Sequence, residues 1–398
     1  MDVTVPSEQR AMLEEIRRFG ENEIDPVTDE FNRAEEYPAA IVDEAAEMGL
    51  LGSHFPVEYG GAGYSMRERA LLIEELFAID PGIALWLTSA DFGSEAILGF
   101  GTEEQKAEYL PPITTGDAVM GAAISEPQAS SDVTSLSTRA EKDAAEAALT
   151  DPSAVEASED GGEWVINGSK MWITNGTVGD YFVVLCETDP ESERPHAGYS
   201  QLIVEADCDG FSAEKITGKL GVRASPTAEL VLDDVRVPEE NLVGERGEGF
   251  YQQMAFFDET RVTVAAQGVG IAKGAADRAR EYAREREQFG QAIADFQAIR
   301  HKLAEMYTAI EAARNLTYKA AWAADTDDVD ATRFASIAKE FSSRVAVDVA
   351  TEAVQIHGGA GYVDDFDVER FYRDAKITQL YEGTTEVQKN VIARELLS

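Results

Sequence analysis

The sequence predicts an α+β protein built from three successive domains, of which the first is helical, the second β and the third helical. Three observations predict this order. Amphipathic helical segments fill the first 118 residues, short β-type runs separated by Gly, Asn, Asp and Pro follow to about 240, and long helical segments return from about 241. With 398 residues, 44% of them hydrophobic, the chain is long enough for two or three domains with their own cores.

We expect an N-terminal α-helical domain over residues 1–118. Two segments, 7–19 and 65–80, have the helical period, and Thr102 followed three residues later by Gln105 has the pattern of a capping box. Prolines separate these segments from one another.

We expect a middle β domain, a small barrel or sandwich, over residues 119–240. Its clearest strands are 181–188, 200–206 and 228–237, each bounded by turn residues. The stretch from about 143 to 162 interrupts this pattern because it is acidic, rich in Ala and poor in large apolar residues. We interpret it as a solvated insertion.

The C-terminal region, 241–398, predicts an antiparallel helical bundle. Apolar residues repeat with the helical period on two segments, one holding Phe296, Ile299, Leu303, Met306 and Ile310 and the other Phe334, Ile337, Phe341 and Val345. Gly268 and Gly270 superficially resemble a dinucleotide-binding loop, but no strand precedes them. We expect them to permit close packing of helices.

The charge is the extreme feature of the composition. The chain carries 75 acidic and 34 basic side chains, a formal net charge of −41. This excess disfavours nucleic acid and anionic membranes as partners. At about 1 M salt the Debye length falls to ~3 Å, so such a surface becomes tolerable. We therefore hypothesise a salt-adapted cytosol, that of a halophile.

Targeting and metal signals are absent from the sequence. No run of eighteen or more apolar residues and no signal peptide are found, which predicts a cytoplasmic protein without a membrane span. The two cysteines and four histidines have no metal-ligand spacing, so no metal site is expected.

The stretch "QLYEGTTEVQ", residues 379–388, places Glu382 beside the start of the last predicted helix. Thr385 and Gln388 have the spacing of a capping box, and a glutamate near a helix N-terminus is stabilised by the helix dipole. On this stretch alone, a structural role for Glu382 is the more common explanation. Other segments shift the balance toward chemistry.

Five separated segments resemble the acyl-CoA dehydrogenase family of flavoproteins. In chain order they are "ISEPQASSDVTSLSTRA", "NGSKMWITNG", "REREQFGQAIADFQAIRHKLAEM", "QIHGGAGYV" and "YEGTTEVQKNVIARELL". Together they span most of the chain in the order of the family, whose fold is also helical, β and helical.

The resemblance implies that Glu382 is the catalytic base. Branches of the family that carry the base on another helix have it at the position of Thr260, so this chain resembles the short- and medium-chain type. Glu259 is one residue away and points about 100° from Thr260 on a helix, which makes it a poor substitute. The base would remove the α-proton of an acyl-CoA thioester while a hydride passes from the β-carbon to flavin N5, giving a trans-2-enoyl-CoA.

The resemblance also implies the residues that bind FAD. Those expected beside the isoalloxazine ring and pyrophosphate, or at the start of the last helix, are Ile124, Ser125, Ser131, Trp172, Thr174, Thr384 and Glu386. Those expected to reach the FAD of a neighbouring subunit are Arg286, Gln288, Phe289, Gln297, Gln355 and Gly359. Without the motifs, Trp172 and Phe289 are equally explained by core packing, and Arg286 by a pair with Glu281 or Glu285. Ser130 stands where the family has a glycine, which puts the angles of that loop in question.

The residues implied in acyl-CoA binding are Ser131, Asp258, Arg261, Tyr381 and Gly383. Asp258 and Arg261 are three residues apart, so a simple ion pair along a helix explains them equally well. Tyr381 is expected to shape the acyl pocket or merely to pack.

Partners and alternatives follow from the same resemblance. We expect electrons to pass to an electron-transfer flavoprotein and the chain to form a homotetramer. An acyl-CoA oxidase would carry the same motifs, and a non-catalytic flavoprotein scaffold is a third possibility. A decarboxylating relative would need a cation at the far end of the acyl pocket, for which "GIALWLTSADFGSEA" offers no clear candidate. The sequence leaves acyl chain length and branching open.

Overall fold

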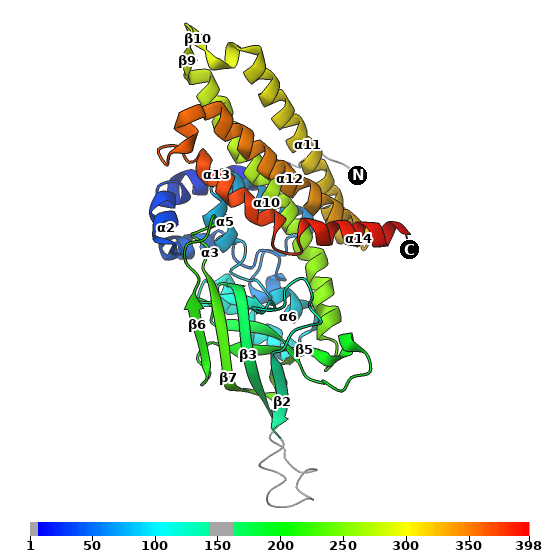
Figure 1. Cartoon of the computed structure of the whole chain (residues 1–398). Helices are drawn as coiled ribbons and strands as arrows, with labels where there is room; N and C mark the ends of the chain where they lie inside the picture. The colour runs from blue at the N-terminus through cyan, green and yellow to red at the C-terminus, as the bar shows by residue number, and fades with distance from the viewer. Residues whose placement is uncertain (1–6, 144–161, 398) are drawn as a thin grey trace, which may run out of the picture.

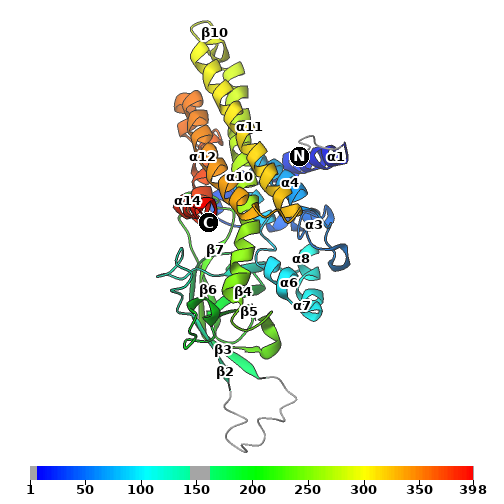
Figure 2. The same cartoon turned by 90° about the vertical axis from the view of Figure 1, so that its right-hand side faces the viewer.

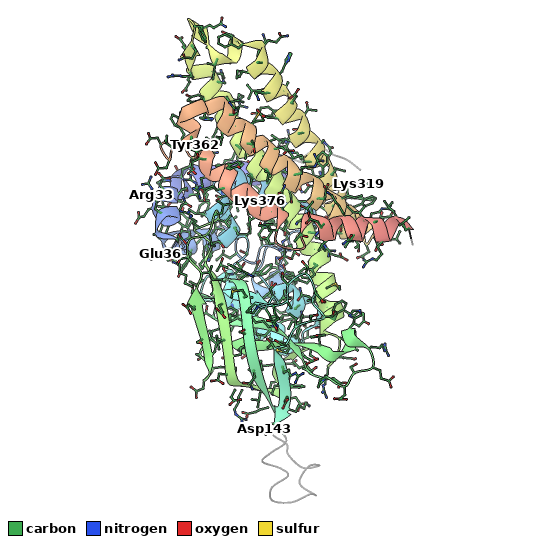
Figure 3. All side chains as sticks on the ribbon, in the orientation of Figure 1. Arg33, Glu36, Asp143, Lys319, Tyr362 and Lys376 are labelled. Carbon is green, nitrogen blue, oxygen red and sulfur yellow. The ribbon has the colours of Figure 1, made fainter. Side chains whose placement is uncertain are left out.

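A computed structural model describes residues 7–143 and 162–397 of the chain, and almost all of the predicted acidic insertion lies outside these ranges. Figure 1 shows a helical region and a long helical bundle above a β-sheet. In the same orientation, Figure 3 places Asp143 at the end of the sheet that points away from the helices. Within the described ranges, no helix is both long and apolar enough to cross a membrane.

The N-terminal region consists of short helices around a buried one. Ser65 and Glu68 form a capping box at the start of α4, and the predicted capping box of Thr102 and Gln105 is present at the start of α7. The helices are α1 (Ser7–Phe19), α2 (Thr28–Ala34), α3 (Val42–Glu47), α4 (Met66–Ile79), α5 (Pro81–Leu87), α6 (Ser94–Phe100), α7 (Glu103–Tyr109) and α8 (Pro111–Thr114).

The middle region forms one hydrogen-bonded sheet with the strand order β6-β7-β3-β2-β4-β5-β8, and β1 pairs with β4. The pairs β1/β4 and β2/β4 are parallel, and the other pairs in this sheet are antiparallel. The predicted strands correspond to β4, β5 and β7. The bounds are β1 (Met120–Ala123), β2 (Arg139–Asp143), β3 (Glu163–Thr174), β4 (Tyr181–Glu187), β5 (Tyr199–Glu205), β6 (Phe211–Lys215), β7 (Thr227–Pro238) and β8 (Leu242–Val243).

The C-terminal region is the predicted antiparallel bundle. Figure 2 shows α10 running from the bundle down beside the sheet, so this one helix connects both halves of the molecule. A short hairpin of β9 and β10 joins α10 to α11 at the far end. The bounds are α10 (Gly249–Glu285), β9 (Glu287–Gln288), β10 (Gln291–Ala292), α11 (Gln297–Asp325), α12 (Ala331–His357), α13 (Val368–Ala375) and α14 (Thr385–Leu397).

Small residues bring the long helices close together. A Cβ on Gly268 would lie 2.9 Å from the Ser342 carbonyl oxygen, and a Cβ on Gly270 would lie 2.5 Å from that of Glu74. The expected packing role of these glycines is therefore confirmed. The predicted apolar face of α12 contacts the core, with Val345 buried and Phe334 and Phe341 half-buried against the core. The deeply buried face carries Ala335, Ala338, Lys339, Ser342 and Ala346.

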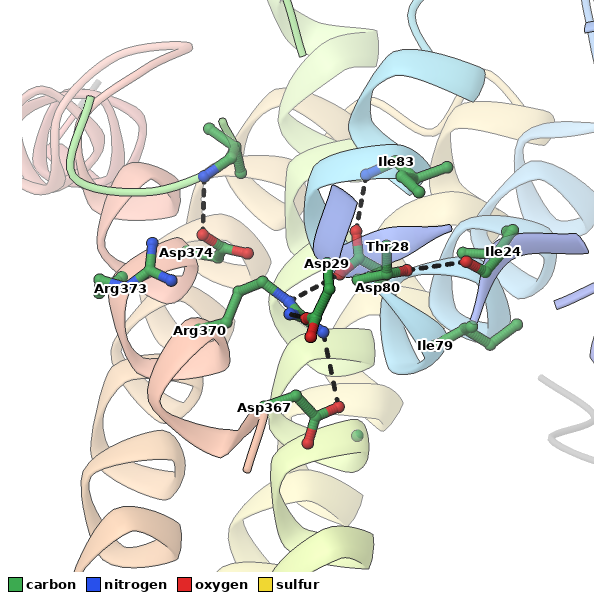
Figure 4. A network of polar contacts seen from close by, with 12 residues as sticks. Ile24, Thr28, Asp29, Ile79, Asp80, Ile83, Asp367, Arg370, Arg373 and Asp374 are labelled. Atoms are coloured by element: carbon green, nitrogen blue, oxygen red, sulfur yellow. Dashed lines mark hydrogen bonds and ion pairs between the residues drawn. The ribbon is translucent and has the colours of Figure 1, made fainter. Parts of the chain in front are cut away.

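A polar network joins the three regions where α13 meets the rest of the chain (Figure 4). Arg370 on α13 contacts two N-terminal carboxylates, with Nη1 2.7 Å from Asp29 Oδ1 and Nε 3.0 Å from Asp80 Oδ2. One turn later, Asp374 accepts a 2.7 Å hydrogen bond from the Val222 N–H of the middle region. The helix that precedes the "YEGTT" stretch is therefore anchored to all three parts of the chain.

Candidate active site

Glu382 lies in a short turn between α13 and α14, and its carboxylate points to α10. The Thr260 hydroxyl donates a 2.6 Å hydrogen bond to Glu382 Oε2. The backbone of Glu382 is left-handed, with φ at 53°, and Gly383 follows with φ at 84°. A left-handed glutamate costs roughly 1–2 kcal/mol, so the surrounding contacts must hold this conformation in place.

The charge of Glu382 is set by opposing effects. Burial is the largest and raises the pKa of this carboxyl above its ordinary value. The hydrogen bond from Thr260 and the positive charges of Lys339 and Arg261 act in the opposite direction and offset part of the rise. The result is a carboxylate with a raised pKa, which suits a group that must accept a proton near neutral pH.

Contacts from three helices hold the turn. From α10, Gln267 accepts a hydrogen bond from the Tyr381 hydroxyl. From α14, Gln388 Nε2 lies 2.9 Å from the Glu382 carbonyl oxygen and 3.0 Å from that of Gly383. From α12, Lys339 Nζ donates to the same Gly383 oxygen at 2.6 Å. The Glu382 N–H has no acceptor within the described part of the chain, which leaves it available to a ligand.

The predicted capping box of Thr385 and Gln388 is wrong. Thr385 is already the first residue of α14, and the Thr384 hydroxyl caps the helix by accepting from the Val387 N–H at 3.3 Å. Gln388 is turned instead toward the carbonyls of the turn. Glu386 is exposed in the first turn, where hydrogen bonds from its own N–H and from the Thr384 hydroxyl lower the pKa of its carboxyl.

Trp172 projects from β3 at an irregularity of the sheet. The register between β3 and β7 shifts between Lys170 and Ile173, and Trp172 takes a left-handed φ of 66°. Its side chain is 62% exposed, so the core-packing explanation is wrong for this residue. The neighbouring Met171 N–H donates to the Ser125 carbonyl at 2.8 Å, which places the Ser125 loop beside the irregularity.

The other predicted residues of this group lie on β3 and on the loop that follows β1. Thr174 is half-buried at the end of β3, whereas Ile124 is buried and Ser131 is exposed on the loop between β1 and β2. Ser130, which replaces the glycine of the family, does not have a positive φ. The serine therefore adds no left-handed strain to the loop.

A buried ion pair, not foreseen from the sequence, lies under this loop. Lys170 Nζ contacts Glu126 Oε1 at 3.0 Å and also donates to the Ile124 carbonyl at 3.0 Å. Burial opposes the ionisation of Glu126, but Lys170 and hydrogen bonds from Ser137 and Thr138 outweigh it and lower its pKa to about 2. The pair ties the loop of Ile124 and Ser125 to the sheet.

A second group of predicted residues lies far from Glu382. Arg286, Gln288, Phe289 and Gln297 are exposed on and beside the hairpin at the end of α10, and Phe289 is 95% exposed. Since α10 rises 1.5 Å per residue, Arg286 is about 40 Å from Thr260 along this helix. The exposure of Phe289 shows that the core-packing explanation is wrong for this residue.

The structure also resolves the alternative for Arg286. Glu281 pairs with Arg280 and Arg284, and neither Glu281 nor Glu285 forms an ion pair with Arg286 within the described ranges.

Gln355 and Gly359 lie near the same end of the bundle. Both are exposed, and they flank His357, whose ring stacks on Tyr282 of α10 with centroids 4.3 Å apart. The predicted cofactor residues thus fall into two separated sets, one around Trp172 on the sheet and one around the hairpin.

Asp258 and Arg261 form the expected ion pair on α10. The second carboxylate oxygen of Asp258 accepts a 2.7 Å hydrogen bond from the Thr332 hydroxyl at the start of α12. Arg261 is buried, and its Nε has no hydrogen-bond partner among the residues that the structure describes. Glu259, the residue beside Thr260, is exposed and makes no contact with Glu382 in the described chain.

A helical–β–helical chain with a half-buried carboxylate beside its long central helix and an exposed tryptophan on its sheet has the architecture of a three-domain flavoprotein oxidoreductase. Three family models match the chain in order: the acyl-CoA dehydrogenase N-terminal domain over residues 6–117, the middle domain over 121–235 and the C-terminal domain over 247–397. The protein belongs to the acyl-CoA dehydrogenase family.

Known proteins of the family are similar over their full length. A short-chain-specific acyl-CoA dehydrogenase of Clostridium acetobutylicum is 40% identical, with 100% of both chains covered. The structure of butyryl-CoA dehydrogenase from Megasphaera elsdenii is 39% identical, with a TM-score of 0.91 and 100% of both chains covered. A chain in a structure of the electron transferring flavoprotein of Acidaminococcus fermentans gives the same TM-score of 0.91, identity of 39% and coverage of 100% of both chains.

Two residues at the site had no role in the sequence analysis. Thr260 was considered only as the position of a base that is absent, although it is the hydrogen-bond donor to Glu382. Lys339 was not considered, although a signal exists: it lies at helical spacing from Ala335, Ser342 and Ala346, on the small-residue face of α12. A lysine on a buried face is uncommon enough to be noticed.

Proposed function

We propose that the protein catalyses the FAD-dependent α,β-dehydrogenation of an acyl-CoA thioester to a trans-2-enoyl-CoA, with Glu382 as the base. The observation that carries this proposal is the half-buried Glu382 carboxylate, hydrogen-bonded to Thr260 and fixed in a left-handed turn. Family membership supports it, because the fold and the Y-E-G-T stretch occur together in this chain.

The residues present fit a flavin. A planar ring needs a flat, exposed apolar partner, and Trp172 supplies one through an unfavourable backbone angle that packing alone does not explain. Ser125, Ser131 and Thr174 offer polar groups around it, and the N-terminus of α14 at Thr384 and Glu386 would face the cofactor. Arg286, Gln288, Phe289, Gln297, Gln355 and Gly359 would serve the FAD of a neighbouring subunit in a homotetramer. When bound, FAD supplies the acceptor for the hydride from the β-carbon.

The chain's own part in the reaction is to remove the α-proton and hold the thioester. The Glu382 carboxylate accepts the proton at an oxygen, and Thr260 keeps the carboxylate in place before the transfer. The unpaired Glu382 N–H would donate to the thioester oxygen and stabilise the enolate-like charge that develops there, as an oxyanion hole does. Gly383 lets the backbone approach the ligand, and Tyr381 would form a wall of the acyl pocket.

Substrate binding would use the start of α12 and the facing surface of α10. Arg261 has an unpaired Nε and a positive charge, which suits the anionic CoA arm, and Asp258 fixes its orientation. The similar short-chain-specific and butyryl-CoA enzymes support a short acyl chain.

The electron acceptor is proposed to be an electron-transfer flavoprotein, in line with the similarity to a chain from such a system. The alternatives are an oxidase, which passes electrons to O₂, and a scaffold without activity. A cytoplasmic location remains part of the proposal, and adaptation to high salt is proposed from the net charge of −41.

One experiment separates these functions. The purified yellow protein should bleach when butyryl-CoA is added without oxygen, and it should reoxidise quickly with an electron-transfer flavoprotein but slowly in air. Fast reoxidation in air would identify an oxidase, and a protein that binds FAD but never bleaches with any straight or branched acyl-CoA would be a scaffold.

A further inference from the structure

Lys339 is a buried cation without a bonded anion. Lys339 lies on α12 and is 0% exposed, and its Nζ donates a hydrogen bond to the Gly383 carbonyl at 2.6 Å. Among the residues that the structure describes, it forms no ion pair. Taking an ammonium group out of water without a paired anion is costly, and burial lowers the pKa of Lys339 to about 8. So costly a placement calls for a physical reason.

The hydrogen bond alone does not supply that reason. Gln388 already donates to the Gly383 oxygen at 3.0 Å, and Ser343, one turn along α12, donates to the Thr378 carbonyl at 2.8 Å. The segment around Glu382 is therefore held by neutral donors at three carbonyls, those of Thr378, Glu382 and Gly383. What Lys339 adds, and a neutral donor does not, is a positive charge.

That charge acts chiefly on Glu382. The charged groups that influence the pKa of Lys339 are Glu382 of the turn, Arg261 of α10 and Glu386 of α14, and Glu382 has the largest influence of the three. Glu386 is exposed, and Arg261 is already paired with Asp258. Lys339 is therefore the cation near Glu382 that no carboxylate binds directly.

We propose that Lys339 is a positioning residue for the base: it holds the Glu382–Gly383 turn through the Gly383 carbonyl and supplies a positive charge near the half-buried Glu382 carboxylate, which favours the ionised form of that carboxylate. This inference rests on the proposed function, since it assumes that Glu382 accepts the α-proton. It predicts that the hydrogen bond and the charge make separable contributions.

Three variants separate the two contributions. Lys339→Gln keeps a donor but removes the charge, so the acid limb of the kcat/KM profile should move to higher pH while kcat above the limb changes little. Below the limb, kcat/KM should fall tenfold for each pH unit of that movement. Lys339→Met loses both contributions, so kcat should fall at every pH. Lys339→Arg restores the charge and should restore the acid limb of the wild type.

A second measurement follows the carboxyl directly and does not depend on turnover. Infrared titration of the FAD-containing enzyme, with Glu382→Gln subtracted to isolate the Glu382 band, should show protonation at higher pH in Lys339→Gln than in the wild type. Lys389→Gln is the matched control, because Lys389 is exposed on α14 and pairs only at 3.7 Å with Glu340. This control should titrate as the wild type does.

The outcomes distinguish a failure of the proposed function from a failure of the proposed role of Lys339. Should Glu382→Gln still bleach with acyl-CoA at the normal rate, the proposed function itself is wrong. If Glu382→Gln is inactive but Lys339→Gln titrates like Lys389→Gln, only the role of Lys339 is overturned. If Lys339→Gln does not fold, Lys339→Arg provides the test instead. An acid limb of Lys339→Arg at higher pH than that of the wild type would overturn the proposed role of the Lys339 charge.

Discussion

Thr260→Val is the substitution that tests the geometry of the base most sharply. Valine has nearly the shape of threonine but cannot donate the 2.6 Å hydrogen bond to Glu382 Oε2. Hydrogen bonds to a charged group contribute about 1.5–3 kcal/mol, and about 1.4 kcal/mol is a factor of ten. The ionised fraction of Glu382 at a pH below the acid limb should therefore fall about 10- to 100-fold.

The assay is the pH profile of kcat/KM with butyryl-CoA and an artificial electron acceptor, since kcat/KM reports the titration of the free enzyme. The acid limb should move to higher pH, while kcat above the limb should change much less. Thr263→Val is the matched control: Thr263 is on the same helix but donates to the Thr260 carbonyl at 2.8 Å, not to the carboxylate. Identical acid limbs in Thr260→Val and Thr263→Val would refute the reasoning.

Three further predictions concern stability. Burial raises the pKa of Glu382 in the folded protein above its pKa in the unfolded chain. The stability that Glu382 contributes is therefore complete below its unfolded-state pKa and is lost as pH rises through its folded-state pKa. Glu382→Gln should therefore unfold at a higher temperature than the wild type at pH 8, with the difference vanishing near pH 4; a difference independent of pH would count against this. Burial raises the pKa of Asp374 to about 7, so the same reasoning applies to this residue. In denaturant titrations, the free energy of unfolding of Asp374→Asn should increase relative to that of the wild type as pH rises from about 4 to 7. A difference that does not change with pH would exclude this prediction. Lys170→Met should cost about 3–5 kcal/mol because it strands the buried Glu126, whereas Lys142→Met, at an exposed pair with Glu239, should cost at most about 1 kcal/mol; equal losses in urea unfolding would contradict the difference in burial.

The salt dependence of stability and activity tests the hypothesis that the net charge of −41 is an adaptation to high salt. If the acidic surface is an adaptation, raising KCl from about 0.1 M to ~1 M should raise both the unfolding temperature and the activity, because the shorter Debye length screens self-repulsion. An enzyme that is most active and fully folded at low salt would remove the hypothesis.

Features of the structure that depend on residues close together in the sequence were predictable from the sequence. The order of helical, β and helical regions, the capping box at Thr102 and the packing role of Gly268 follow from period and spacing. The cap at Thr385 was misplaced by one residue because Thr384 and Thr385 offer the same side chain. Only the three-dimensional turn decides which hydroxyl faces the free N–H groups.

Contacts between distant segments were not predictable in this way. Glu382 meets Thr260 across 122 positions of the chain, Gly383 meets Lys339 across 44, and Lys170 meets Glu126 across 44. No periodicity encodes such pairs. The family resemblance singled out Glu382, but the donor that orients it and the cation that lies near it emerge from the packing of α10 and α12 against the turn.

The central claim is that the Glu382 carboxylate removes the α-proton of an acyl-CoA thioester beside a bound flavin. Anaerobic mixing of the yellow Glu382→Gln protein with butyryl-CoA tests it most directly, with the wild type measured alongside. The claim predicts that the variant keeps its colour and its affinity for the thioester but does not bleach. Bleaching of the variant at the rate of the wild type would contradict it.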